Sequence, residues 1–196
     1  MMKEEKDTNQ VYKCDFRHPQ LNFAVSGNKR REPEAEFANV FVDVYKKNFS
    51  QIHSSSNKKT ALFVREVPVS GNGIADLLVL NWANDSLQED QVSPDFSTSE
   101  TTIRAFEFKL SDWRNGLMQA HRYKYFSNAS ILVVPKKKLK MIMEHLEMFQ
   151  KLRIGLWGFE PESQKITRAF TPRPKHQQIH KYKTRALELV ATAIPS

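Results

Sequence analysis

Two apolar segments of this chain contain charged residues at positions that a packed β-sheet would bury. Residues 73–80 (GIADLLVL) include Asp76, and residues 102–110 (TIRAFEFKL) include Glu107 and Lys109. Successive side chains of a strand point to opposite faces, so Glu107 and Lys109 project from the same face. Burying such charges is costly unless they are paired or bind a metal ion. If the two segments are neighbouring strands, two carboxylates and one ammonium meet at one point, which predicts a site for a metal ion and a water molecule.

The pattern along the rest of the 196 residues predicts one α/β domain. An amphipathic helix is expected after Pro33, because apolar residues recur there at three- and four-residue spacing. The Gly71-Asn72-Gly73 cluster predicts a tight turn between two antiparallel strands. A strand-helix-strand crossover after Lys109 implies a parallel pair. The expected fold class is therefore a mixed central β-sheet flanked by helices.

Further elements follow from the same criteria. We expect strands at 60–69, 73–82, 101–110, 130–135, 154–160 and 165–172, and helices at 112–126, 137–152 and 175–193. Ser111 is the expected N-cap of the second helix. Residues 1–31 are expected to form an N-terminal arm, ordered or partly disordered, residues 32–175 the core, and residues 176–196 a C-terminal helix or tail. Within the core, residues 83–100 are expected to form an acidic insertion loop.

The charge distribution favours a polyanionic partner. The formal net charge is +8, although residues 83–100 carry five acidic side chains and no Lys or Arg. The rest of the chain is therefore strongly basic, which favours nucleic acid over a membrane, since no amphipathic basic helix stands out. A solvated basic surface is the alternative.

Cysteine content and hydropathy indicate the compartment. The single cysteine, Cys14, excludes an internal disulfide and a cysteine-based metal cluster. No apolar run approaches the roughly 20 residues of a membrane span, and the first residues lack the apolar stretch of a signal peptide. We therefore expect a cytoplasmic protein without a membrane partner.

A set of residues in the first two thirds of the chain resembles a known enzyme family. An acidic helix is followed by a strand with Asp76, a strand with Glu107-Phe108-Lys109 and a helix with Gln119. This order is similar to that of the PD-(D/E)XK nuclease family, which has the restriction-endonuclease-like fold. The resemblance covers about residues 33–135.

Some features refine this resemblance. The segment 108–126 looks like small phage and bacterial members that lack an assigned target. Ala75, rather than Pro, precedes Asp76, and 30 residues separate Asp76 from Glu107, more than in compact members. The acidic insertion accounts for that length.

The resemblance implies a divalent metal site. Asp76, Glu107 and the backbone carbonyl of Phe108 would hold Mg²⁺ or Mn²⁺, ions that prefer oxygen ligands. An acid of the first helix, either Glu34 or Glu36, would bind the ion through a water molecule or recruit a second ion.

The resemblance also implies two catalytic roles outside the metal ligands. Lys109 would orient or deprotonate the attacking water and stabilise the charge that develops on phosphate. Gln119 would position Lys109 or a phosphate. The alternatives are a buried ion pair between Lys109 and the acids that only specifies the sheet, and a solvated position for Gln119.

Five further residues are candidates for nucleic-acid contacts. Two share the helix of Gln119, and three form a basic cluster after the expected strand 130–135: Arg122, Tyr123, Lys136, Lys137 and Lys138. Basic side chains neutralise phosphates without reading sequence. Charge runs are also common on solvated faces, so a plain surface role is the alternative.

The leading functional hypothesis is a metal-dependent deoxyribonuclease that hydrolyses phosphodiester bonds. The alternative is a catalytically silent protein of the same fold that binds nucleic acid or regulates. A third hypothesis, an interaction protein that docks through its acidic loop, has no positive motif. The sequence leaves open DNA versus RNA, the strandedness of the substrate, end versus internal attack, and whether the chain forms a homodimer.

Overall fold

The computed structural model describes residues 20–22, 32–53, 59–69, 71–83, 101–174 and 179–192. Its strands are β1 (Gln20–Asn22), β2 (Lys59–Val69), β3 (Gly73–Ala83), β4 (Thr102–Phe108), β5 (Ala129–Pro135), β6 (Gly155–Glu160) and β7 (Lys165–Phe170). Its helices are α1 (Glu32–His53), α2 (Trp113–Tyr123), α3 (Lys136–Met143), α4 (Leu146–Leu152) and α5 (His180–Thr192).

The strands form one seven-stranded mixed sheet whose spatial order, β1 to β7, is also their order in the chain. The pairs β2–β3, β3–β4 and β6–β7 are antiparallel. The pairs β1–β2, β4–β5 and β5–β6 are parallel. Gly71 (φ 81°) and Gly73 (φ 88°) form the turn between β2 and β3, in a backbone region that glycine adopts readily. The predicted mixed sheet, the antiparallel hairpin and the parallel crossover after Lys109 are confirmed.

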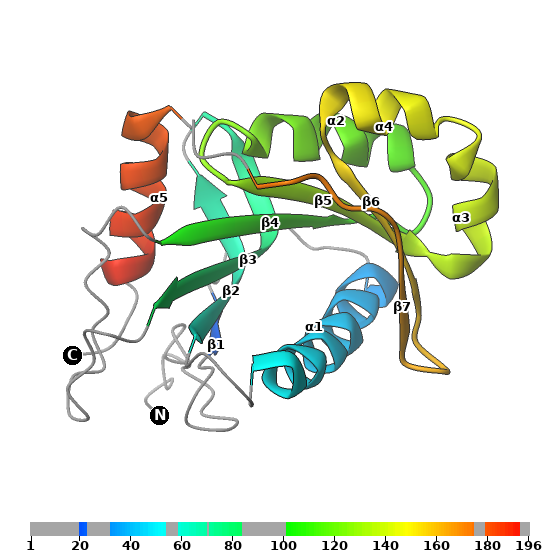
Figure 1. Ribbon diagram of the computed structural model, residues 1–196, viewed down its shortest axis with the longest axis horizontal. Coiled ribbons are helices and arrows are strands. Elements are labelled where there is room, and N and C mark those ends of the chain that lie inside the picture. Colours follow the sequence, from blue (N-terminus) through cyan, green and yellow to red (C-terminus); the bar gives the residue numbers. More distant parts are fainter. Residues whose placement is uncertain are drawn as a thin grey trace, which may run out of the picture.

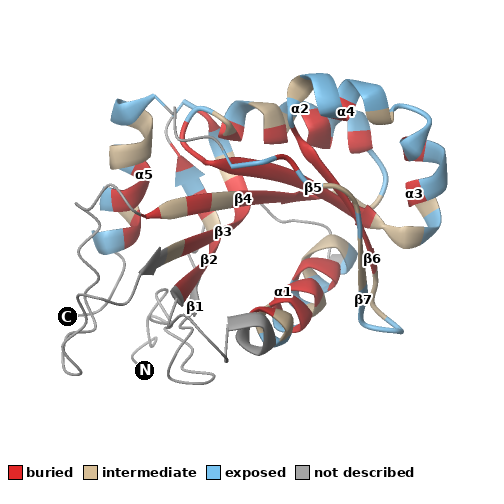
Figure 2. Cartoon of the chain, viewed as in Figure 1, coloured by how far each residue is buried: buried red, intermediate tan, exposed pale blue. Residues whose placement is uncertain are grey.

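Helices cover both faces of this sheet (Figure 1). On one face α1 packs against an aromatic core that includes Phe41, Phe106, Phe108 and Trp157, all buried. On the other face, α2 and α5 cover β2 to β4, while α2, α3 and α4 cover β5 to β7. Burial is therefore concentrated in the sheet and on the inner sides of the helices (Figure 2). The chain forms an α/β/α sandwich with the carboxyl ends of β4, β5 and β6 at one edge.

Two local predictions were wrong. The helix expected over 137–152 is divided into α3 and α4, because the backbone leaves helical geometry at His145 (φ −104°, ψ 16°). The apolar spacing continues across this break, with Ile142 and Phe149 both buried, so periodicity alone does not reveal it. The N-cap of α2 is Asp112, not Ser111: its carboxylate accepts a hydrogen bond from the backbone N–H of Asn115 at 3.2 Å. Both residue types cap helices well, and they are adjacent.

Several predicted segments fall partly outside the described residues. Of the expected arm 1–31, only β1 is described, and it pairs in parallel with β2. The acidic segment 84–100 lies outside the described part of the chain. None of the described helices combines the length and the apolar character needed to cross a bilayer.

Candidate active site

The strand register brings the charged residues of β3 and β4 together. Leu77 pairs with Phe106 in the antiparallel ladder, so one step further along it Asp76 lies opposite Glu107. Directly opposed residues project from the same face of a sheet. Asp76 is 2% exposed and Glu107 is 0% exposed. The expectation that the two strands are neighbours is confirmed, and their register places Asp76 opposite Glu107.

A hydrogen bond to the backbone of β4 fixes one oxygen of the Asp76 side chain. Its Oδ2 accepts a hydrogen bond of 2.7 Å from the backbone N–H of Phe108. The N–H and C=O of one strand residue point toward the same neighbouring strand. The carbonyl of Phe108 therefore faces the β3 side, where Asp76 lies, as the metal hypothesis requires.

Both oxygens of Glu107 contact polar groups. Oε1 lies 2.7 Å from Nζ of Lys109, and Oε2 accepts a 2.6 Å hydrogen bond from the hydroxyl of Tyr123. The same hydroxyl lies 2.6 Å from the carbonyl oxygen of Ile74. A phenol carries one proton, so this hydroxyl is shared between two acceptors. An ammonium therefore lies on one oxygen of Glu107 and a phenol on the other.

Lys109 connects β4 to α1. Its Nζ lies 3.2 Å from Oε1 of Glu34, and its side chain is 16% exposed. Glu34 is half-buried, whereas Glu36 is exposed. Of the two candidate first-helix acids, the structure brings Glu34 to the site. Lys109 thus holds its ammonium between a buried and a partly solvated carboxylate.

Helix α2 lies over this edge of the sheet. A Cβ added to Gly116 would stand 2.5 Å from Cγ of Lys109, so the helix backbone rests on the stem of that lysine. One turn and two turns further along the same helix face are Gln119 and Tyr123. Gln119 is half-buried, and its Oε1 is shielded from solvent without a hydrogen-bond donor among the described residues. Gln119 therefore lies on the face of α2 that covers Lys109 and Glu107, and its role in positioning Lys109 or a phosphate stays a prediction.

Two predicted nucleic-acid contacts on α2 have different outcomes. Tyr123 is 1% exposed and supports Glu107, so the prediction that its side chain contacts nucleic acid was wrong. Its apolar ring fills the core while its hydroxyl reaches the site. Arg122 is exposed and lies near the β2–β3 turn, 3.8 Å from the position of a Cβ on Gly73. An exposed guanidinium here is compatible with the predicted phosphate contact.

The basic cluster begins α3, at the same sheet edge as Lys109. Lys137 is exposed, and Lys136 and Lys138 are partly exposed. Nζ of Lys136 lies 3.4 Å from Oε2 of Glu160 at the end of β6. A hydrogen bond from Ser163, and to a smaller extent the charge of Lys136, hold the pKa of Glu160 below its ordinary value, against the opposing effect of burial.

Sequence reasoning missed a buried group behind Asp76. Arg65 of β2 is 4% exposed; its Nε donates to the carbonyl oxygen of Asp76 at 3.1 Å, and Nη1 donates to Oδ1 of Asn39 at 2.6 Å. A charged residue inside the apolar run 60–69 is the same signal that identified Asp76. The next residue, Glu66, has φ 55° and lies opposite Asp76 by register, although it forms no ladder pair there. A non-glycine residue in this conformation is strained, and such residues concentrate at functional sites.

The donor set of this edge suits a hard cation, because its carboxylates and the neighbouring carbonyl are oxygen ligands. Among the described residues, however, no three acidic, histidine or cysteine side chains converge as a ready-made metal cluster. In this arrangement Lys109 and Tyr123 hold the carboxylate of Glu107 instead. Comparison of the chain with protein-family models, with curated proteins and with solved structures finds no match.

Proposed function

We propose that this protein is a metal-dependent nuclease of the PD-(D/E)XK type, with a restriction-endonuclease-like fold and DNA as its polymer. The observation that carries the proposal is the opposition of Asp76 and Glu107 on neighbouring strands, with Lys109 two residues beyond at the open edge. An ion pair alone requires one acid, whereas here the ammonium of Lys109 contacts both Glu107 and Glu34, and Asp76 lies opposite Glu107 on the neighbouring strand.

The proposed reaction is attack of water on the phosphorus of a phosphodiester, with release of one alcohol oxygen. Asp76, Glu107 and the carbonyl of Phe108 would hold Mg²⁺ or Mn²⁺, which would neutralise phosphate charge and acidify the bound water. Lys109 would orient the water and stabilise the charge that develops on the phosphoryl oxygens. Glu34 would keep the ammonium of Lys109 in place from the opposite side. Gln119 would use its unpaired amide oxygen to position Lys109 or the attacking water.

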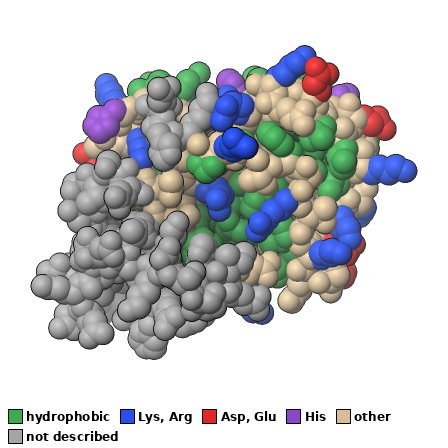
Figure 3. Space-filling model, viewed as in Figure 1, with side chains coloured by type: hydrophobic (Ala, Val, Ile, Leu, Met, Phe, Trp, Pro, Cys, Tyr) green, Lys and Arg blue, Asp and Glu red, His purple; other side chains and the backbone are tan. Residues whose placement is uncertain are grey.

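The surface charge supports a polyanionic substrate. Lys and Arg side chains lie over the middle of the described part of one face, whereas Asp and Glu side chains lie nearer its rim (Figure 3). The basic start of α3 lies at the sheet edge that carries Lys109. Such a surface steers nucleic acid toward the site and binds it in a salt-dependent manner.

A specific observation favours the second candidate, a silent nucleic-acid-binding protein. Both oxygens of Glu107 already have protein partners, which is also how a purely structural buried acid is satisfied. The two candidates share the fold and the basic surface and differ only in whether the carboxylates bind metal.

Cleavage of a substrate panel separates these candidates. Supercoiled plasmid, linear duplex, single strand, branched DNA and RNA are incubated with Mg²⁺, Mn²⁺ or EDTA. The test variant is Asp76→Asn, whose amide oxygen can still accept the hydrogen bond from Phe108, and the matched control is Asp43→Asn, which removes the same charge from an exposed position of α1.

We expect metal-dependent cutting by the wild type and by Asp43→Asn, and its loss in Asp76→Asn. No cutting of any substrate, combined with binding that weakens as salt rises, would favour the silent protein. Equal cutting by wild type and Asp76→Asn would refute the proposed site.

A further inference from the structure

The strands β3 and β4 separate at the candidate active site. Their antiparallel ladder ends at the pair Leu77–Phe106, beyond which β3 continues beside β2 and β4 continues beside β5. The side chain of Asp76 bridges the fork that this leaves, because its Oδ2 accepts the hydrogen bond from the backbone N–H of Phe108 at 2.7 Å. The position of the Asp76 carboxylate relative to Glu107 therefore depends on what holds the β3 side of the fork.

Arg65 of β2 holds this part of β3 from the α1 side of the sheet. Its Nε donates to the carbonyl oxygen of Asp76 at 3.1 Å, and its Nη1 donates to Oδ1 of Asn39 on α1 at 2.6 Å. From the α2 side, the hydroxyl of Tyr123 lies 2.6 Å from the carbonyl oxygen of Ile74, two residues before Asp76. The backbone around Asp76 is thus held from both faces of the sheet.

The alternation of side chains breaks in both strands at the level of Glu66 and Asp76. In a regular strand, residues two apart share a face. Here, residues three apart pack in the same core beneath α2 and α5: Val64 and Val67 in β2, and Ala75 and Leu78 in β3. Glu66 lies inside this break and has φ 55°. Regular sheet geometry therefore does not set the direction of the Asp76 side chain, and the contacts of Arg65 act where that direction is decided.

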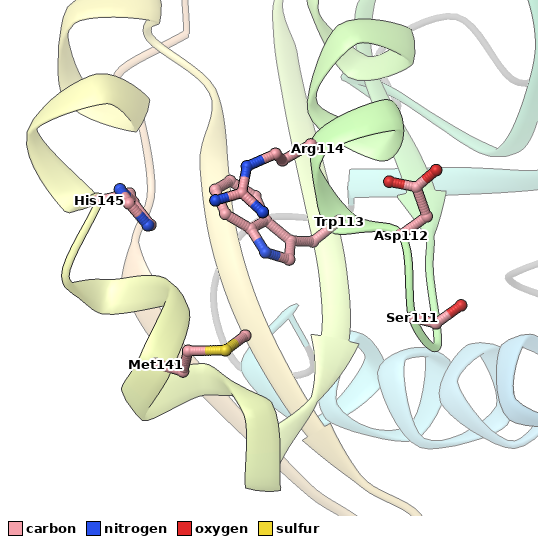
Figure 4. Close-up of a pocket in the computed structure, with 6 residues that line it drawn as sticks. All are labelled: Ser111, Asp112, Trp113, Arg114, Met141 and His145. Atoms are coloured by element: carbon pink, nitrogen blue, oxygen red, sulfur yellow. The ribbon is translucent and has the colours of Figure 1, made fainter.

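Arg65 lies on the side of the sheet away from the described cavity. This cavity, of about 270 Å³, opens beside the first turn of α2 (Figure 4) and is lined by Ser111, Asp112, Trp113, Arg114, Met141 and His145. Trp113 packs in the core beneath α2, α3 and α4, whereas Arg65 contacts α1 and is 4% exposed. A ligand on the α2 side does not reach Arg65, so any effect of this residue on the site passes through Asp76.

We propose that Arg65 is a positioning residue of the metal site. Its guanidinium, anchored on Asn39, fixes the backbone of Asp76 and thereby the direction in which the Asp76 carboxylate meets the metal ion. A planar guanidinium donates in two directions from one rigid group, which an ammonium does not. The proposal rests on the proposed nuclease function for the metal ion and extends it to a residue that touches neither metal nor substrate. Charge alone predicts the opposite effect, because a buried positive charge near a cation site opposes metal binding.

Mn²⁺ binding in the absence of nucleic acid tests the proposal without cleavage. Titration calorimetry gives the Kd of Mn²⁺ for wild type, Arg65→Met and Arg65→Lys, each well below its unfolding temperature. Loss of a group that orients a metal ligand typically weakens binding 10- to 100-fold, so we expect the Kd of Arg65→Met to rise about tenfold or more. Arg65→Lys keeps the charge but not the two-directional plane, and it should also bind Mn²⁺ more weakly.

Arg104→Met is the matched control, because Arg104 also joins the sheet to α1, through the hydroxyl of Tyr45 at 2.6 Å. It lies at the start of β4, three residues before Glu107, and its loss should not raise the Kd of Mn²⁺. A Kd for Arg65→Met equal to or below that of the wild type would overturn the proposal. Full affinity in Arg65→Lys would overturn the two-contact role of the guanidinium.

Hydrogen exchange gives a readout that needs no metal ion. The N–H of Phe108 donates to Asp76, whereas the N–H of the next residue, Lys109, donates to the carbonyl oxygen of Val133 in β5 at 3.0 Å. Displacement of Asp76 should speed exchange at Phe108 alone, whereas a general loss of stability would speed both amides. We expect the selective effect in Arg65→Met, with Asp76→Ala giving its full size. Equal acceleration of both amides would show that Arg65 only stabilises the sheet, and would overturn the proposal.

Asn39 offers variants that leave the core intact, because its side chain is exposed. Asn39→Ala removes the acceptor for Nη1 of Arg65, whereas Asn39→Asp keeps one. We expect Asn39→Ala to speed exchange at Phe108 and to raise the Kd of Mn²⁺, and Asn39→Asp to do neither. Wild-type values in Asn39→Ala would overturn the anchoring of Arg65 on α1. If the wild type binds no Mn²⁺ while the selective exchange effect is present, the metal-dependent function fails and the positioning of Asp76 by Arg65 stands.

Discussion

At the scale of single residues, the charged side chains of the site are fixed by ion pairs with one another. Glu107 is fully buried, and Lys109 lies 2.7 Å from it while also contacting Glu34 at 3.2 Å. Removing one partner of a buried pair leaves an uncompensated charge, which is more damaging than replacing both. Stability and activity should therefore respond differently to single and paired substitutions.

The double substitution Glu107→Gln with Lys109→Met tests this separation. Lys109→Met alone should lower the free energy of unfolding by about 3 kcal/mol, and adding Glu107→Gln should recover most of that loss. Cleavage should be absent from both variants, because neither has the ammonium. Urea unfolding and plasmid cleavage provide the two readouts. A double variant that still cuts at the wild-type rate would show that Lys109 only stabilises the sheet.

Glu66 is the second residue-scale feature, because its φ of 55° is unfavourable for a side chain with a Cβ. Glycine adopts this conformation without strain. We expect the free energy of unfolding of Glu66→Gly to exceed that of Glu66→Ala by about 1 kcal/mol. Both variants lack the carboxylate, so the difference between them reports the backbone strain. Urea midpoints of the two variants measure this difference. Equal midpoints would show that the strand relaxes at position 66 once the carboxylate is gone.

At the scale of elements, α2 determines the geometry of the site. Gly116 rests on Lys109, Gln119 lies one turn further on, and Tyr123 binds Glu107. One helix therefore sets the positions of the lysine and of its buried partner. The spacing of these residues could be read from the sequence, whereas the burial of Tyr123 could not, because helical periodicity does not state which neighbours a face will meet.

Gly116→Ala tests whether α2 sets the position of Lys109. The added Cβ would lie 2.5 Å from Cγ of Lys109 and 2.7 Å from Cδ1 of Leu132, so the lysine or the helix must shift. Misplacement of about 1 Å can cost on the order of 100-fold in rate. We expect cleavage to fall far more than the midpoint of thermal unfolding does. Ala120→Gly, on the same helix and buried, changes helix propensity by a similar amount in the opposite direction, so it shows how strongly cleavage depends on propensity alone. Full activity of Gly116→Ala would indicate that the lysine is not held by the helix.

Helix α2 also contains a histidine, His121, whose protonation makes the stability of the fold depend on pH. Burial, and secondarily the charge of Lys124, hold the pKa of His121 below its ordinary value. The unfolded state then binds a proton at higher pH than the folded state, so stability rises with pH across this interval. The contribution is complete above about pH 6.5 and declines as the pH falls below it. Urea titrations from pH 5 to 7.5 should show a steeper decline for the wild type than for His121→Gln.

At the scale of the whole molecule, the basic surface should determine how binding depends on salt. Lys137 is exposed at the start of α3, on the edge that carries the site. If it contacts a phosphate, Lys137→Gln should weaken binding equally for all sequences and reduce the slope of log K against log salt by about 1. Glu147→Gln, an exposed substitution on α4, provides a control that removes the opposite charge. An unchanged slope in Lys137→Gln would show that this lysine does not contact a phosphate.

The sequence predicted most of this architecture because its strongest signals are local. Alternation in the strands, the Gly71-Asn72-Gly73 turn and the helical spacing after Pro33 each specify an element within a few residues. The meeting of Asp76 with Glu107 followed from strand adjacency. The break at His145 did not, because the apolar spacing passes through it, and the cavity beside it depends on that break.

The identity of spatial and chain order in the sheet has a consequence for biosynthesis. Each strand from β2 to β7 pairs with the strand synthesised just before it. Each pair joins consecutive strands, so the loops that close are no longer than one crossover, and contacts close in sequence favour rapid folding. The sheet can therefore grow strand by strand as the chain emerges from the ribosome, in the manner of domains that fold during synthesis. Asp76, Glu107 and Lys109 would be assembled, and covered by α2, before β6, β7 and α5 have been made.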